Sequence, residues 1–165
     1  MQTTAPPTEY RLRLSSKHLM LASPSLRKMY SGDWKETTLR DEDGLLSWDV
    51  GDLFDPNAFI IVMNVVHGLN RKVPRAVDLE LLAKIAVIVD YLQCHESMDV
   101  FSAIWIDGLR SSLPGTYGRE LILWIMVSSI FRDQEVFGTA TRTAILNARE
   151  EVPSVGLPIH QRIIS

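Results

Sequence analysis

The feature that most constrains this chain is a series of apolar segments of helical length, separated by strong helix-start and helix-end signals. Asp55-Pro56 places a capping side chain before a proline at the first helical position, and Gly68 closes that segment. Asp78 and Asp133 provide further caps, and Pro114-Gly115 is the clearest break in the chain. These signals predict helices at about 56–67, 78–92, 97–109, 119–131 and 134–148.

The N-terminal third predicts shorter elements of both kinds. Residues 10–14 and 46–50 alternate apolar and polar side chains, which indicates two half-buried strands. Residues 17–22 form a compact helical turn, and Ser23-Pro24 begins a second short helix that reaches about residue 30. The expected fold class is therefore α+β and mostly helical.

Composition narrows the class of protein. The chain has 165 residues, of which 46% are apolar and 22% charged, and its net charge of −3 argues against a nucleic-acid binder. One cysteine excludes an internal disulfide and fits a reducing compartment. The longest uninterrupted apolar run, residues 121–127, is far shorter than the roughly 20 residues of a membrane span. We expect an intracellular protein, in cytoplasm or nucleus, with no membrane and no nucleic acid among its partners.

No pattern for catalysis, metal binding or cofactor binding is present. No histidine pairs with another histidine or cysteine at metal-ligand spacing, and no glycine-rich phosphate loop occurs. The sequence therefore predicts no catalytic residue, no metal, no cofactor and no small-molecule substrate. The alternative is an enzyme of unrecognised type that uses Asp90, Cys94 and His95. Adjacent helical residues such as Cys94 and His95 point in different directions, which disfavours it.

The charges are segregated along the chain. Residues 1–40 contain seven basic and three acidic residues, whereas residues 78–107 contain six acidic residues and one lysine. Such segregation can steer a partner or be paired within the molecule. A solvated surface of mixed charge is the simpler alternative.

Three stretches of sequence together resemble one family. Residues 16–29 place a His and a Leu before Ser-Pro and an apolar helix, and residues 32–36 read Gly-Asp-Trp-Lys-Glu. Residues 73–91 form a long apolar stretch that begins with Val-Pro-Arg. These three stretches resemble the corresponding stretches of BTB/POZ proteins of the type found in filamentous fungi. The resemblance covers about residues 10–112 and continues, through Leu113, Tyr117 and Leu157, into the extension that the fungal proteins carry.

This resemblance implies a fold and a function. It implies a small sheet flanked by a helical cluster at 10–112, followed by a C-terminal helical extension at 113–165. Residues 1–9 are polar with two prolines, so we expect them to form a disordered tail. The first strand of the family is missing here. BTB/POZ domains are non-enzymatic adaptor and oligomerisation modules without cofactors, so the partners are proteins, and a second copy in a homodimer is one candidate. The alternatives are a substrate adaptor of a cullin-type ubiquitin ligase, a transcription-associated protein, or a truncated form without function.

The resemblance also implies where a partner binds. The family pairs through its first strand and first short helix, so we expect an exposed strand edge at residues 10–14 to recruit a strand from a second copy or another protein. The residues expected at this protein interface are Arg11, Arg13, His18, Leu19 and Met20.

Overall fold

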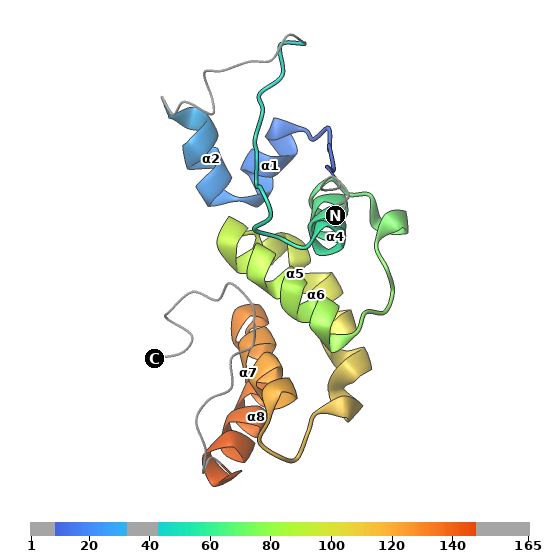
Figure 1. Cartoon of the computed structure of the whole chain (residues 1–165), viewed down its shortest axis with the longest axis vertical. Helices are drawn as coiled ribbons and strands as arrows, with labels where there is room; N and C mark the ends of the chain where they lie inside the picture. Colours follow the sequence, from blue (N-terminus) through green and yellow to red (C-terminus); the bar gives the residue numbers. More distant parts are fainter. Residues whose placement is uncertain (1–8, 33–42, 148–165) are drawn as a thin grey trace, which may run out of the picture.

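The computed structural model describes residues 9–32 and 43–147, and these two ranges contain seven α-helices (Figure 1). They are α1 (Ser16–Ala22), α2 (Pro24–Ser31), α4 (Pro56–Val66), α5 (Leu79–Leu92), α6 (His95–Leu109), α7 (Arg119–Phe131) and α8 (Gln134–Asn147). Short 3-10 turns, η1 (Asn70–Lys72) and η2 (Arg110–Ser112), follow α4 and α6. The predicted helices are thus confirmed, with boundaries that differ by one or two residues.

Helix α5 is the centre of an elongated molecule. It contacts α4 and α6 on one side and α7 on another, and α8 packs against α7. Figure 1 shows the α1–α2 pair at one end of the long axis and the α7–α8 pair at the other. The C-terminal helices therefore pack directly on the rest of the fold through α5.

The helices begin where the sequence places capping side chains. Asp55, Asp78 and Asp133 each accept a hydrogen bond from the backbone N–H three residues later, at 2.8–2.9 Å. Ser23 caps α2 in the same way, and its hydroxyl also donates to the carbonyl oxygen of Leu92 at the end of α5. Since Ser23 is buried, this one side chain both starts α2 and ties it to the central helix.

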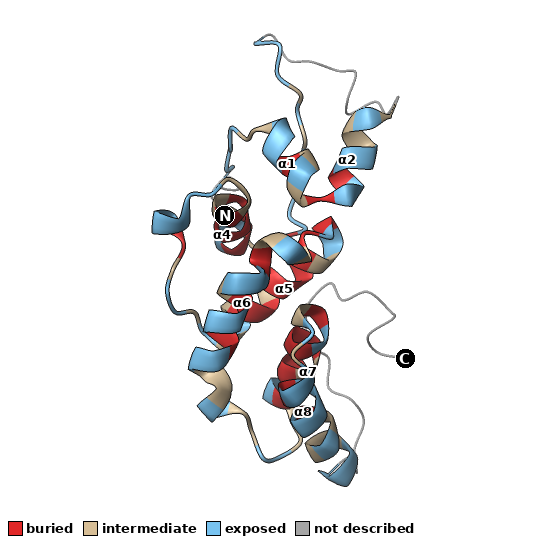
Figure 2. Ribbon diagram, turned by 180° about the vertical axis from the view of Figure 1, so that it is seen from behind, coloured by how far each residue is buried: buried red, intermediate tan, exposed pale blue. Residues whose placement is uncertain are grey.

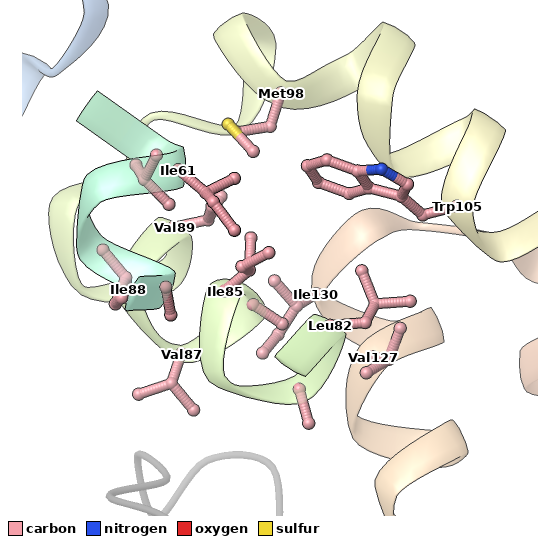
Figure 3. Close-up of a cluster of buried hydrophobic side chains, with 14 of the residues drawn as sticks. Ile61, Leu82, Ile85, Val87, Ile88, Val89, Met98, Trp105, Val127 and Ile130 are labelled. Carbon is pink, nitrogen blue, oxygen red and sulfur yellow. The ribbon is translucent and has the colours of Figure 1, made fainter. Parts of the chain in front are cut away.

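One hydrophobic core runs through these helices. It extends from Leu19 of α1 to Ala140 of α8, and eight residues of α5 are buried in it. Figure 2 shows the buried residues concentrated on α4, α5 and α7, while the outer faces of α2, α6 and α8 are exposed. Figure 3 shows side chains of α4, α5, α6 and α7 meeting in one cluster.

The expected α+β fold class is wrong, because no β-strand occurs in the described ranges. The alternating segments 10–14 and 46–50 instead lie against helices. Trp48 meets Phe59 of α4 in an edge-to-face contact with ring centroids 6.1 Å apart, while its neighbours Ser47 and Asp49 are exposed. Alternation requires only a non-helical segment with one buried side, and here a helix provides the burial that a sheet was expected to provide.

The BTB-like small sheet is therefore not present at residues 9–32 and 43–147, and the segment 10–14 is not the edge of any sheet in these ranges. Residues 1–8 of the tail expected at 1–9, and residues 148–165 of the expected extension, lie outside the described residues. Among the helices that the structure describes, none is long and apolar enough to cross a membrane.

Candidate interaction surface

A small groove lies between the segment at residues 9–15 and helix α4. Its volume is about 150 Å³. The segment contributes Leu12, Arg13 and Leu14, and α4 with its C-cap contributes Ile60, Met63 and His67. None of its lining residues is acidic. We call this feature the N-terminal groove.

A histidine holds the segment onto α4. The backbone N–H of Ser15 donates to Nε2 of His67 at 3.0 Å, and Nδ1 of the same ring lies 2.8 Å from the carbonyl oxygen of Met63. Nε2 therefore accepts a hydrogen bond and Nδ1 donates one, which is the pattern of a neutral ring. His18 of α1 stacks on His67 with ring centroids 5.2 Å apart. The side chain of His67 thus joins α4 to the backbone of the segment and to the ring of His18 in α1.

The structure places the predicted interface residues in different environments. Arg13 is exposed at the groove, and His18 is exposed above His67. Arg11 is exposed and forms an ion pair with Glu9 at 2.9 Å, and the hydrogen bond from this pair raises the pKa of Arg11. Met20 is half-buried, and Leu19 is only 3% exposed. Leu19 is therefore a core residue that cannot contact a partner, whereas Arg13 and His18 are accessible to one.

The backbone beside the groove has free hydrogen-bonding capacity. No N–H or carbonyl group of residues 10–14 bonds to another residue of the described ranges. Tyr10 and Leu12 are 59% and 43% exposed, and Leu69 on the far side of the groove is 44% exposed. Apolar surface and unpaired backbone groups therefore occur together here, which is the combination that a peptide or protein partner can satisfy.

The surroundings of the groove are basic. Lys17 lies on α1, and Arg71 and Lys72 follow Leu69 in η1. In the part of the chain that the structure describes, neither these three nor Arg13 forms an ion pair. This surface therefore favours an acidic partner.

A second exposed apolar surface lies on α6. Val100 and Ile104 are 68% and 47% exposed, and they lie one turn apart on the exposed side of the helix. Glu96, Asp99 and Ala103 are exposed beside them. We call these five residues the α6 face. Glu96 and Asp99 also line a second groove of about 380 Å³, together with His95 and Ser102 of α6 and with Phe131 and Arg132 at the end of α7.

The residues of the enzyme hypothesis lie close together but lack the geometry of a nucleophile and its base. Nε2 of His95 is 3.8 Å from Oδ1 of Asp90, and burial lowers the pKa of His95 while Asp90 opposes that shift. Cys94 is 1% exposed, and burial raises its pKa to about 12. Its thiol is therefore protonated at neutral pH, which is the unreactive form. Within the described residues, no group of three His, Cys, Asp or Glu side chains could hold a metal ion.

Sequence reasoning missed His67, Leu69 and the α6 face as surface features. The contact between Ser15 and His67 joins residues 52 positions apart, and no local pattern predicts it. The α6 face carried a weak signal, because Val100 and Ile104 share one side of a helix that has no lysine or arginine.

Comparison with protein-family models, with curated proteins and with solved structures finds no match for this chain. The resemblance to BTB/POZ proteins therefore depends on the sequence stretches at 16–29, 32–36 and 73–91 alone, and it stays a prediction.

Proposed function

We propose that this chain is a non-enzymatic protein–protein interaction module that binds its partner through the N-terminal groove. The observation that supports the proposal best is the segment at residues 10–14. Its backbone groups have no partner among the described residues, and it borders an apolar groove with unpaired basic residues around it. The binding is homo- or hetero-oligomerisation, or adaptor binding of the kind that BTB/POZ proteins perform.

The BTB/POZ relation enters this proposal only as a sequence resemblance, because the small sheet of that family is not present in the described ranges. An adaptor role for a cullin-type ligase or in transcription has no separate support. We also propose that the protein works inside the cell, in cytoplasm or nucleus. The support is its single cysteine, which is a free and buried thiol.

Light scattering of the full chain at several concentrations tests this function directly. We expect a mass above that of one chain that falls on dilution. Replacing Leu12 by Asp places a carboxylate in the apolar groove and should shift the chain to monomer. The matched control is Leu21→Asp, because Leu21 is a 78% exposed leucine of α1 that does not line the groove.

A second pair of variants separates the backbone from the charge. Arg13→Pro removes both the N–H donor and the charge, whereas Arg13→Ala removes the charge alone. We expect the proline variant to associate more weakly than the alanine variant. If neither Leu12→Asp nor Arg13→Pro changes an oligomeric parent, the groove is not the interface. A parent that stays monomeric at every concentration refutes self-association and leaves binding of a different protein as the surviving form of the proposal.

A further inference from the structure

The α6 face is acidic, although Arg132 at the end of α7 lines the same groove as its Glu96 and Asp99. Helix α6 has no lysine or arginine, and neither Glu96 nor Asp99 forms an ion pair with another described residue. Asp107, the third acidic residue of α6, does form an ion pair: its Oδ1 lies 3.8 Å from Nε of Arg110. The N-terminal part of the α6 face is therefore an apolar strip beside two unpaired carboxylates.

The N-terminal groove has the opposite character. Five of its eight lining residues are apolar and none is acidic, and unpaired Arg13, Arg71 and Lys72 lie in or beside it. We propose that the α6 face of one copy of this chain binds the N-terminal groove of a second copy. This inference rests on the proposed function and names the partner for the same site.

The dimensions of the two surfaces agree. Side chains at positions i and i+4 of a helix lie about 5–6 Å apart, so Val100 and Ile104 form one compact apolar ridge. The groove offers about 150 Å³ between Leu12, Leu14 and the side chains of α4, which is room for aliphatic side chains of this size. Glu96 and Asp99 then meet arginine side chains and the free backbone N–H groups of the segment. Carboxylates accept both kinds of donor.

The contact joins two different surfaces, because no residue belongs to both the α6 face and the N-terminal groove. If the two copies exchange this contact reciprocally about a twofold axis, both surfaces of each copy are occupied and a dimer closes; otherwise the contact is heterologous, and each copy that has one surface occupied still presents the other. The parent chain is therefore expected to form either a closed assembly, of which the reciprocal dimer is the smallest, or open assemblies that grow with concentration.

A mixing experiment tests this arrangement with two variants of the full chain. Val100→Lys blocks the α6 face, because the added positive charge repels the basic residues around the groove. Leu12→Asp blocks the groove itself. We expect each variant alone to be monomeric by light scattering, with a Kd at least about tenfold weaker than that of the parent. An equimolar mixture should form a complex of two chains that does not grow further, because only one intact groove and one intact α6 face can meet.

Control variants keep the experiment independent of folding. Ile145→Lys is the control for Val100→Lys, because it introduces a lysine at a 79% exposed residue of α8. Leu21→Asp is the control for Leu12→Asp, because it introduces an aspartate at an exposed leucine outside the groove. All four variants should retain the melting temperature and the far-UV spectrum of the parent. Association of the parent should also weaken between 0.1 and 1 M salt, because the Debye length falls from about 10 Å to about 3 Å.

The outcomes separate this inference from the proposed function. A parent that associates while the mixture of folded variants stays monomeric overturns the pairing of α6 with the groove but leaves the groove as an interface. If Val100→Lys alone associates as strongly as the parent, the pairing is also overturned, because the α6 face is then not required for association. A parent that is monomeric at all concentrations refutes self-association itself, and with it this inference.

Discussion

Truncation of Ile85 to alanine tests whether α5 is the centre of the core. Ile85 is 0% exposed and points into a cluster with Ile61 of α4 and Ile130 of α7 (Figure 3). The substitution removes three carbon groups, and at about 0.8 kcal/mol for each the transfer term is about 2.4 kcal/mol. Because α4, α6 and α7 all pack on α5, the cavity should not close completely. We expect the free energy of unfolding to fall by about 2–5 kcal/mol.

The assay is urea unfolding followed by far-UV circular dichroism, at a concentration where the parent is monomeric. Ile104→Ala is the matched control, because it makes the same chemical change at a 47% exposed position of α6. The control should change the free energy of unfolding by no more than about 0.5 kcal/mol, with the same dependence on urea. If Ile85→Ala differs from this control by less than about 0.5 kcal/mol, the placement of α5 is wrong.

Three further predictions concern single polar or sulfur groups. Ser23→Ala should lower the free energy of unfolding by about 1–3 kcal/mol, because it removes the cap of α2 and leaves the buried carbonyl of Leu92 without its donor; urea unfolding measures this. Asp55→Ala should cost about 0.5–2 kcal/mol at neutral pH. The N–H of Ala58 lowers the pKa of Asp55 from 3.8, so its stabilisation is present above that value and is lost as pH falls through the lowered folded pKa. Unfolding curves of parent and variant should therefore converge on acidification, and a gap that persists at low pH contradicts this. Cys94, whose pKa is raised to about 12, should react with a disulfide reagent at pH 8 on the order of a thousandfold more slowly in the folded chain than in denaturant.

The sequence predicted the helices well because the signals for a helix are local. A cap and the first turn that it serves lie within three residues of each other, as at Asp55, Asp78 and Asp133. The period of the apolar residues then gives the length of each helix. Both kinds of information are complete within a window of about 15 residues, so tertiary contacts are not needed to interpret them.

The fold class was wrong because a strand needs a partner that the local pattern does not contain. Residues 10–14 and 46–50 alternate as a half-buried strand would, but alternation reports only that one side of the segment is buried. In this structure, Trp48 and Leu14 bury their side chains against the helical core. The predicted burial of alternate residues is thus present at 46–50, whereas Tyr10 and Leu12 of the segment 10–14 are 59% and 43% exposed. The neighbouring strand that defines a sheet is absent from the described ranges.

The candidate site was partly predictable for the same reason. Arg11, Arg13 and His18 were expected on the surface, and each is exposed. Leu19 was expected there too, but it is buried because it lies on the side of α1 that faces the core. Neither the groove nor the stacking of His18 on His67 could be predicted, because both depend on bringing α4 against a segment about 50 residues earlier in the chain.

The exposed apolar residues of α6 are not required by the fold. The helix is already anchored by Met98, Ser102, Trp105 and Ile106, which are buried, and the indole N–H of Trp105 donates to the carbonyl oxygen of Pro74 at 2.9 Å. A polar residue or alanine at positions 100 and 104 would keep this inner side unchanged and would serve a helix at least as well, since β-branched residues have lower helix propensity. Single exposed apolar residues need no explanation, but two on one helical strip beside unpaired carboxylates form a patch that water solvates poorly. This is why we place the second half of the interface on α6 rather than on the other exposed helices.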